Sequence, residues 1–334
     1  MICVYGAGSI GCYVGGRLAA AGAEVAFVGR RRLADEIAAH GLTLTDLRGA
    51  ERRVDAPRYE TGPDAAAAAA EADLVLVTVK SAATADAADQ LAAHLRPGAV
   101  VVSLQNGLRN AAVLREKLPE AAVLAGMVAF NVVRTGPGRF HRGTDGGLEV
   151  QDDPALDAAA ERFDRAGLPL ARHADLTGVQ AAKLLLNLNN PLNALSGQPL
   201  RTQLSQRVFR RCLALAQREA LAAYKAAGIA PAKTAGVDSR LLPLLLGLPD
   251  AVFTRAAAKM LAIDPLARSS TWDDLEAGRP TEVDYLNGEI AALAAEHGLA
   301  APVNERLTAL VHAAEQGGRR DWTGPELLAE LRRA

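Results

Sequence analysis

A glycine-rich turn near the start of the chain has the composition of a dinucleotide-binding loop. The run Gly6-Ala7-Gly8-Ser9-Ile10-Gly11 directly follows the apolar segment Ile2–Tyr5 and opens an amphipathic segment. In a GxGxxG loop the first glycine permits a tight turn, the second lets the backbone approach a pyrophosphate, and the third lets the helix pack closely on the strand. The first helical amide groups then face the phosphates. We therefore interpret five residues as cofactor-binding, with a plain glycine turn as the alternative: Gly6, Gly8, Ser9, Ile10 and Gly11.

Arginines follow the second apolar segment. Glu24–Val28 is followed by Gly29 and then by Arg30, Arg31 and Arg32. An NAD enzyme usually places Asp or Glu here to bind the ribose hydroxyls, whereas a basic residue accommodates the 2′-phosphate of NADP. The sequence therefore predicts NADPH/NADP+ as the cofactor, with Arg30 at the 2′-phosphate. The alternative is a solvated, basic start to the next helix.

Three polar side chains interrupt a leucine-rich segment in the second half. Lys183 and Asn187 are four residues apart and project from one face of a helix, and Asn190 follows three residues later. Hydride delivery to a ketone develops negative charge on its oxygen. A lysine whose pKa is lowered by burial could stabilise that charge and donate a proton. The alternative is a solvated helix face with these side chains turned outward, although the surrounding leucines indicate an interior helix.

Lys80 and Asn106 each follow an apolar segment, Leu74–Val79 and Ala99–Leu104. Ligands of open α/β sheets bind at the carboxyl ends of the strands, where both residues would lie. A solvated turn lysine and an Asn-Gly turn at Asn106-Gly107 are the alternatives.

Short apolar segments that alternate with helical ones predict the elements that position these residues. A further strand is expected at Val123–Val133, and helices at Ile10–Ala21, Ala82–Leu95 and Arg109–Leu118, with a short helix over Ala65–Ala70. This pattern is typical of βαβ units and a doubly wound, mostly parallel sheet of the Rossmann type. Glycines between positions 136 and 147 indicate a hairpin and loops.

From about Asp153 the apolar residues recur at helical spacing, so the second domain is expected to be mostly α-helical. We place a nucleotide-binding domain at residues 1–172 and a helical domain at 173–334. The predicted helices are 155–166, 176–195, 203–227, 283–297, 302–315 and 325–331.

Composition narrows the class of protein. A chain of 334 residues favours two domains, and a net charge of −1 gives no electrostatic reason to expect nucleic acid or an anionic membrane as partner. Three cysteines without a CxxC pair, no charged leader and no long apolar stretch predict a cytoplasmic protein. The six histidines lack metal-ligand spacing, so no metal is expected. The sequence does not decide between a monomer and a homodimer.

Taken in order along the chain, these motifs resemble those of ketopantoate reductases. They are Gly6–Gly11 with the following arginine, Val79-Lys80, Gln105-Asn106-Gly107, the block from Lys183 to Leu192, and the block from Ser269 through Glu282 to Gly288. The resemblance implies a Rossmann domain followed by a helical domain, as in 6-phosphogluconate dehydrogenase. It also implies NADPH-dependent reduction of 2-dehydropantoate to pantoate, a step of pantothenate biosynthesis.

The resemblance also implies roles for individual residues. Lys183 would be the catalytic lysine and Glu282 an active-site acid. Lys80 and Asn106 would contact the cofactor, and Asn106 would line the substrate site with Asn187, Asn190 and Ser270. Taken alone, Glu282 is equally suited to complement a helix dipole and Ser270 to be an N-cap. The stretch between the asparagines is one residue shorter than the usual family pattern, so Asn189 and Asn190 both stay open.

Three other functions stay open on the sequence. One is an NADPH-dependent reductase of a different 2-oxo acid, and another is a non-catalytic protein that senses NADP(H). A dehydrogenase of a phosphorylated substrate would need a basic cluster in the helical domain, for which Arg207, Arg210 and Arg211 are candidates. The segment 235–265, rich in leucine and proline, is interpreted as a cap over the substrate site.

Overall fold

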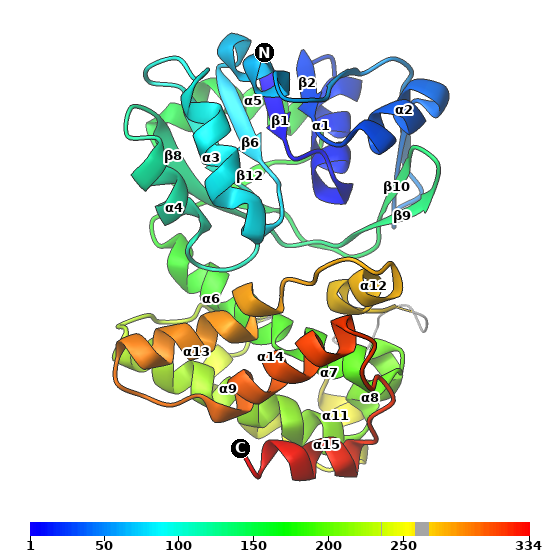
Figure 1. Ribbon diagram of the computed structural model, residues 1–334, viewed down its shortest axis with the longest axis vertical. Helices are drawn as coiled ribbons and strands as arrows, with labels where there is room; N and C mark the ends of the chain where they lie inside the picture. The colour runs from blue at the N-terminus through cyan, green and yellow to red at the C-terminus, as the bar shows by residue number, and fades with distance from the viewer. Residues whose placement is uncertain (235, 258–266) are drawn as a thin grey trace. The chain divides into compact units, whose positions relative to one another are not determined.

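The computed structural model describes residues 1–234, 236–257 and 267–334. The chain divides into two compact units, Met1–Leu176 and Thr177–Ala334, a few residues beyond the predicted division at 172/173 (Figure 1). The division falls later because β12 (Leu170–His173) is the last strand of the N-terminal sheet, so residue 173 belongs to that sheet. The segment predicted as a cap falls partly outside the described residues, and the remainder includes two short helices, α10 (Leu242–Leu246) and α11 (Asp250–Ala256).

The N-terminal unit is built on an eight-stranded sheet in the order β12-β11-β8-β7-β6-β1-β2-β5. The six strands from β5 to β8 are parallel, β11 runs antiparallel to β8, and β12 runs parallel to β11. The order of the strands reverses at β1, which is where open α/β sheets bind ligands. The remaining strands are β1 (Ile2–Tyr5), β2 (Val25–Val28), β5 (Arg58–Glu60), β6 (Leu74–Val77), β7 (Val100–Ser103), β8 (Ala122–Val128) and β11 (Leu148–Gln151).

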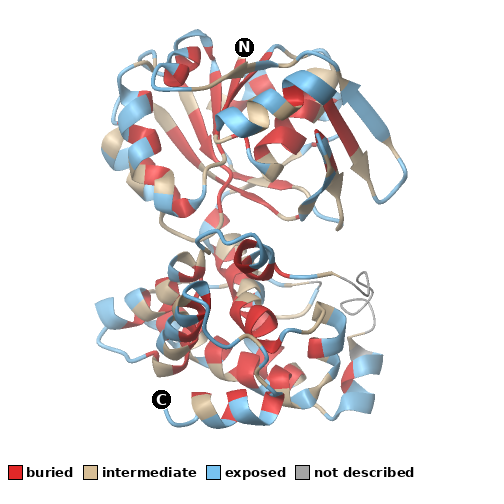
Figure 2. Cartoon of the chain, turned by 45° about the vertical axis from the view of Figure 1, so that its right-hand side comes forward, coloured by how far each residue is buried: buried red, intermediate tan, exposed pale blue. Residues whose placement is uncertain are grey.

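Helices cover both faces of this sheet, because the central strands are apolar on both sides. Ile2 and Val4 of β1 belong to one buried cluster with α1 and α5, whereas Cys3 and Tyr5 belong to a second cluster with η1, α3 and α4. Figure 2 shows the buried strands between these layers. The fold class is therefore the predicted one. The helical elements are α1 (Ser9–Ala20), α2 (Arg31–His40), η1 (Ala65–Glu71), α3 (Thr84–Ala92), α4 (Asn110–Lys117) and α5 (Asp157–Arg165).

A second, four-stranded sheet in the order β4-β3-β10-β9 was not predicted. The single strand expected over Val123–Val133 is wrong, because the chain leaves the large sheet after Val128 and starts β9 in the small one. The glycines at 136 and 138 form the expected hairpin between β9 and β10. The four strands are β3 (Leu42–Asp46), β4 (Glu51–Val54), β9 (Val132–Gly136) and β10 (Arg139–Arg142).

The C-terminal unit is built from helices around the 20-residue α9, which contacts α7, α10, α13, α14 and α15. The long helix expected over 176–195 is two helices, α6 and α7, with a turn at Leu188. Pro191 explains the break, since its nitrogen cannot donate to the carbonyl of Asn187 one turn earlier. The helices not yet bounded are α6 (Leu176–Asn187), α7 (Asn189–Ser196), α8 (Leu200–Ser205), α9 (Arg207–Ala226), α12 (Ser270–Glu276), α13 (Asn287–Glu296), α14 (Pro302–Glu315) and α15 (Gly324–Leu331).

All three cysteines are buried free thiols. Cys3 and Cys12 lie in the two N-terminal core clusters, and Cys212 lies on the inner side of α9. Burial raises the pKa of the Cys3 and Cys212 thiols to about 12 and raises that of Cys12 further. Each cysteine therefore packs as a small apolar side chain.

No helix among the described residues combines the length and the hydropathy that crossing a bilayer requires.

Candidate active site

The glycine loop joins β1 to α1, and each of its three motif glycines has a different environment. Gly6 has a φ of +98°, and a Cβ there would lie 2.4 Å from the Val79 nitrogen. A Cβ on Gly11 would lie 2.5 Å from Thr78 Oγ1 and 3.0 Å from Val4 Cγ1. A Cβ on Gly8, in contrast, would meet only the Gly6 carbonyl oxygen, at 3.9 Å. Packing within the chain thus requires the first and third glycines, whereas open space lies in front of the second.

That open space adjoins the first turn of α1. Gly8 is the N-cap residue and has no side chain with which to cap the helix, and no acidic residue lies in the first turn. The first turn, which includes Ser9 and Ile10, thus carries the positive end of the helix dipole without a neutralising carboxylate of its own. The loop fits a pyrophosphate group, which would accept hydrogen bonds from these backbone amides.

Arg30 is the N-cap residue of α2 and directly follows β2 and Gly29. Its side chain is exposed, and among the described residues no carboxylate or carbonyl pairs with the guanidinium of Arg30, Arg31 or Arg32. Gly29 itself is required by packing, because a Cβ there would lie 2.2 Å from the Tyr59 hydroxyl. The end of β2 therefore presents positive charge, which suits a phosphate better than ribose hydroxyls alone.

Lys80 and Asn106 lie in the turns that follow two neighbouring parallel strands, β6 and β7. Lys80 is exposed and precedes the 3-10 turn η2 (Ser81–Ala83), whereas Asn106 is half-buried and precedes Gly107, which has a φ of +88°. Both residues therefore lie at the carboxyl edge of the sheet, as does the glycine loop.

A buried hydrogen-bond network joins these two turns. Gln105 Nε2 donates to the Val79 carbonyl oxygen at 3.0 Å and to Thr84 Oγ1 at 2.7 Å. Thr84 Oγ1 donates to Asn110 Oδ1 at 2.7 Å, and Asn110 Nδ2 donates to the Asn106 carbonyl oxygen at 2.6 Å. Such fully bonded networks hold backbone segments in one arrangement.

The sequence interpretation assigned no function to Thr84 or Asn110. A signal was available: Asn110 opens a helix four residues after the Asn-Gly turn, a position from which an amide reaches back to the turn.

Lys183 lies on α6 in the C-terminal unit and is half-buried, and the two leucines that follow it, Leu184 and Leu185, are buried. Burial lowers the pKa of its ammonium group to about 8, and the negative charge of Glu282 acts in the opposite direction. Glu282 is the N-cap residue of the 3-10 turn η5 (Val283–Tyr285), but its side chain makes no capping hydrogen bond. The Glu282 carboxylate is therefore not used as a helix cap, and its charge raises the pKa of Lys183. A carboxylate and an ammonium group with a shifted pKa are typical components of an acid–base site.

The two candidate asparagines after the turn have different surroundings. Asn189 is buried, and its side-chain amide is paired with that of Gln203 by two hydrogen bonds of 3.0 and 3.1 Å. Asn190 is less buried, and its Nδ2 lies 3.4 Å from Ser270 Oγ. The amide of Asn189 is thus used within the helical core, whereas Asn190 meets another predicted substrate-binding residue. Asn187, one turn after Lys183, forms no side-chain hydrogen bond with any described residue.

Ser270 is not the N-cap of its helix. That position belongs to Ser269, whose Oγ accepts a hydrogen bond from Trp272 N at 3.2 Å and donates to the Asn190 carbonyl oxygen at 3.1 Å. Asn193 Oδ1 also accepts from Ser269 N at 2.9 Å. Ser269 and Asn193, to which the sequence interpretation gave no role, thus fix the start of α12 against α7, which places Ser270 beside Asn190.

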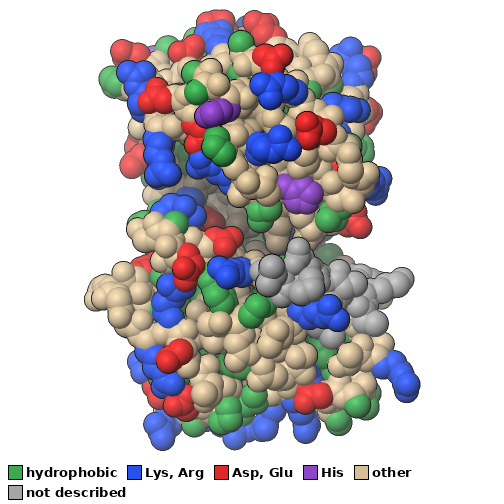
Figure 3. Space-filling model, turned by 90° about the vertical axis from the view of Figure 1, so that its right-hand side faces the viewer, with side chains coloured by type: hydrophobic (Ala, Val, Ile, Leu, Met, Phe, Trp, Pro, Cys, Tyr) green, Lys and Arg blue, Asp and Glu red, His purple; other side chains and the backbone are tan. Residues whose placement is uncertain are grey.

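The spacing of candidate metal ligands and the balance of charge in the sequence predict neither a metal centre nor a nucleic-acid partner. Among residues 1–234, 236–257 and 267–334, no group of three or more His, Cys, Asp or Glu could hold a metal ion. On the face in Figure 3, acidic and basic side chains are interspersed over the N-terminal unit rather than gathered by sign.

The family of the chain follows from comparison with known proteins. A family model described as "Ketopantoate reductase PanE/ApbA" matches residues 2–154, and the model of its C-terminal region matches residues 175–315. The 2-dehydropantoate 2-reductase of Halobacterium salinarum is 31% identical over 328 residues, which cover 95% of this chain and 99% of that one.

Solved structures agree with this result. The PanE/ApbA family ketopantoate reductase from Ralstonia eutropha JMP134 has a TM-score of 0.81 and 31% identity, and the match covers 95% of this chain and 99% of the other. D-mandelate dehydrogenase, solved with NADH and anilino(oxo)acetate, has a TM-score of 0.76 over the same shares of the two chains. At 20% identity, the second likeness shows the fold alone.

Proposed function

Because the chain belongs to the ketopantoate reductase family, whose members are oxidoreductases acting on a CH–OH group, we propose that it reduces 2-dehydropantoate to pantoate with NADPH. The observation that carries this proposal is Lys183, whose pKa of about 8 lies near neutrality and which has an acid, Glu282, beside it. A protein that only sensed the nucleotide would not need such a pair. A reductase needs a group that can give up a proton at physiological pH.

Glycine-loop geometry and Arg30 support the choice of cofactor. The open space at Gly8 and the uncapped start of α1 suit the pyrophosphate, and Arg30 suits the 2′-phosphate that distinguishes NADPH from NADH. Lys80 and Asn106, held by the buried network at the same sheet edge, would bind the rest of the nucleotide. When bound, the nicotinamide supplies the hydride.

Lys183 would hold and protonate the oxygen that becomes the hydroxyl group. In the charged form its ammonium donates a hydrogen bond to the carbonyl oxygen of the substrate, where negative charge develops during reduction. It then gives that oxygen a proton, so that one ketone, one hydride and one proton yield one alcohol. Glu282 would keep the ammonium charged and oriented, since a nearby negative charge favours the protonated form.

Asn190, Ser270, Asn187 and Asn106 would bind the remainder of the substrate. Ketopantoate carries a carboxylate and a hydroxymethyl group, which need donors and acceptors beyond the lysine. Asn190 and Ser270 present an amide and a hydroxyl at one place in the C-terminal unit, and their mutual hydrogen bond of 3.4 Å is long enough to yield to a ligand.

The proposal is tested by following NADPH oxidation by the purified protein with a panel of 2-oxo acids that includes ketopantoate, pyruvate and 2-oxoisovalerate. We expect ketopantoate to give the highest kcat/KM, and NADPH to exceed NADH. A higher kcat/KM for another 2-oxo acid would keep the reaction and overturn the substrate. Absence of turnover with every acid, in protein that binds NADPH with micromolar affinity, would favour a sensor.

A further inference from the structure

A row of arginines runs along one side of α9, a helix that carries none of the predicted catalytic, cofactor-binding or substrate-binding residues. Arg211 and Arg218 follow Arg207 by four and eleven residues, which at 3.6 residues per turn places all three within about 40° of one line. The row is about 16 Å long at 1.5 Å per residue. Ala214 lies on the same line, and its small side chain leaves space between Arg211 and Arg218.

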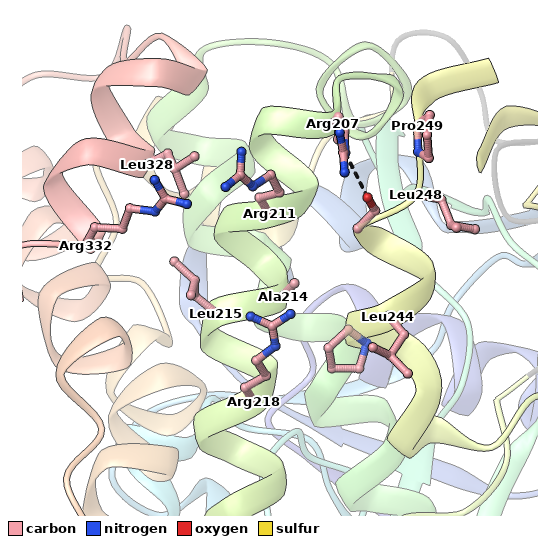
Figure 4. Close-up of a pocket in the computed structure, with 12 residues that line it drawn as sticks. Arg207, Arg211, Ala214, Leu215, Arg218, Leu244, Leu248, Pro249, Leu328 and Arg332 are labelled. Atoms are coloured by element: carbon pink, nitrogen blue, oxygen red, sulfur yellow. Dashed lines mark hydrogen bonds between the residues drawn. The ribbon is translucent and has the colours of Figure 1, made fainter. Parts of the chain in front are cut away.

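This row forms one wall of a cavity of about 590 Å³ in the C-terminal unit, within the size range of small-molecule sites. Figure 4 shows Arg211 on α9 and Arg332 at the end of α15 extending toward each other, and Arg218 extending toward α10. Twelve residues line the cavity: Arg207, Arg211, Ala214, Leu215, Arg218, Pro243, Leu244, Gly247, Leu248, Pro249, Leu328 and Arg332.

The lining contains four arginines and no acidic residue. Arg207 Nε donates to the Gly247 carbonyl oxygen at 2.8 Å, a neutral partner (Figure 4). The carboxylates closest in sequence already have partners. Asp250 accepts from the buried Arg210 at 2.9 Å and from the backbone nitrogen of Arg207 at 2.8 Å, and Glu219 accepts from the backbone of Val303 and Asn304. Like charges one helical turn apart destabilise a helix, so an anion in this cavity would relieve repulsion between the guanidinium groups.

Arg210, which the sequence grouped with Arg207 and Arg211, does not belong to this row. Its guanidinium is fully buried, donates to Leu246 and Leu248 carbonyl oxygens, and lies 4.0 Å from the Phe253 ring centre. It is therefore a structural residue, whereas the row is exposed.

Apolar side chains line the rest of the cavity. Leu244 is 65% exposed, and Leu215, Leu248 and Leu328 also line the cavity. A ligand that matches both the arginines and the leucines of the cavity needs a group with several negative charges and a short apolar group.

We propose that this cavity binds an organic diphosphate whose phosphates lie on the arginine row and whose apolar group contacts Leu244. A single carboxylate would leave most of the positive charge unmatched, whereas a diphosphate carries two to three negative charges. A second copy of the chain is disfavoured as occupant, because a two-fold interface would set four arginines against four more.

The site is separate from the proposed active site. Gln217 and Tyr224, which donate to the Leu185 and Ala181 carbonyl oxygens of α6, project from a different side of α9. The inference therefore does not depend on the proposed function.

Isothermal titration calorimetry with inorganic pyrophosphate tests the charged part of the site. We expect Arg211→Gln/Arg218→Gln to weaken binding at least tenfold, and the matched control Arg201→Gln/Arg333→Gln, which removes two arginines outside the cavity, to stay within twofold of wild type. Equal losses of affinity in both double variants would overturn the proposal. So would the absence of saturable pyrophosphate binding to wild type, or binding that Arg211→Gln/Arg218→Gln leaves unchanged. Since neither variant touches the glycine loop, the difference between them should persist in a Gly8→Asp background.

Isopentenyl diphosphate, which adds a five-carbon apolar group to the same head group, tests the apolar part. It should bind at least threefold more tightly than pyrophosphate, and Leu244→Ser should remove that advantage while leaving pyrophosphate binding unchanged. Equal affinities of the two probes for wild type would contradict the assigned ligand class. Sedimentation showing that the arginine row mediates dimerisation, with dimers lost in Arg211→Gln/Arg218→Gln, would assign the surface to a second copy instead.

Discussion

Asn190 and Ser270, 80 positions apart in the sequence, meet through their side chains, with Asn190 Nδ2 3.4 Å from Ser270 Oγ. The neighbouring Asn189 instead pairs with the buried Gln203. Two adjacent asparagines at the start of α7 thus have different surroundings. Asn189 belongs to the helical core, whereas Asn190 lies on the surface that would meet the substrate.

Asn190→Ala and Asn189→Ala should therefore fail in different ways. The first should raise KM for ketopantoate about tenfold, the value of one lost hydrogen bond to a charged group, with little change in melting temperature. The second leaves a buried Gln203 amide without its partner, which should lower the free energy of unfolding by about 1–3 kcal/mol. Steady-state kinetics and thermal unfolding of both variants check this. An Asn189→Ala variant of native stability with a raised KM would reverse the assignment.

Lys183→Ala should lower kcat at least about 100-fold, the range for loss of a positioned acid, while the Kd for NADPH changes little. Lys183→Arg should not restore the rate, because guanidinium stays protonated and has a different shape. Glu282→Gln should cost less, since it removes only the charge beside Lys183. The measurement is single-turnover hydride transfer at saturating ketopantoate. A Lys183→Ala rate within a few-fold of wild type would leave the lysine a merely structural role.

The pH dependence should follow the lowered pKa of Lys183, about 8. Reduction requires the charged ammonium, so kcat/KM for ketopantoate should fall as pH rises through about 8. Oxidation of pantoate requires the neutral amine and should become faster over the same range. Between this pKa and the ordinary 10.5 of an exposed lysine, the unfolded chain binds more protons than the folded one. The contribution of Lys183 to the free energy of unfolding should therefore rise with pH in that window. Profiles that do not change between pH 7 and 9 would remove Lys183 as the acid.

Arg30→Ala should weaken NADPH binding by about 1.5–3 kcal/mol, the value of a charge-assisted hydrogen bond, and leave NADH binding nearly unchanged. Arg52→Ala, which removes another exposed arginine of the same unit, is the matched control. Fluorescence titration of wild type and both variants with NADPH and NADH gives the six affinities needed. Equal losses for NADPH and NADH would mean that Arg30 does not bind the 2′-phosphate.

Asn110→Ala should affect both stability and cofactor binding, because Asn110 joins the turns that carry Lys80 and Asn106. Loss of a buried amide that bonds to three partners should lower the free energy of unfolding by about 1–3 kcal/mol. It should also raise the Kd for NADPH, since the Asn106 turn loses its anchor. Exposed Asn131→Ala provides the control. A destabilised variant with unchanged NADPH affinity would show that the network only supports the fold.

The sequence predicted strands where β1, β2, β6, β7 and β8 lie because these are short apolar runs, and Ile2–Tyr5 agrees to the residue. It missed β5, β11 and β12 of the same sheet and β3, β4 and β10 of the small one, because these strands carry more polar residues and are paired by contacts from distant parts of the chain. The break at Leu188 was also missed, although Pro191 signals it.

The residues of the candidate site also fall into two groups, those that a local sequence pattern predicts and those that depend on contacts between distant parts of the chain. Glycine spacing and the polar residues of α6 were visible locally, and so they were named in advance. The Asn110 network and the capping of α12 by Ser269 depend on pairs such as Asn110 with Ser81 and Asn193 with Ser269, 29 and 76 positions apart. The bond from Asn110 to the Asn106 turn is local, but no local pattern encodes these distant partners, because they depend on the packing of whole elements.

The burial of all three thiols gives the protein a built-in set of chemical reporters. A thiolate, not a thiol, reacts with iodoacetamide, and burial holds Cys3, Cys12 and Cys212 in the thiol form. Alkylation therefore waits for the surrounding structure to open. Since Cys3 and Cys12 lie in one unit and Cys212 in the other, the order in which the three become labelled during gentle heating records which half of the molecule loosens first.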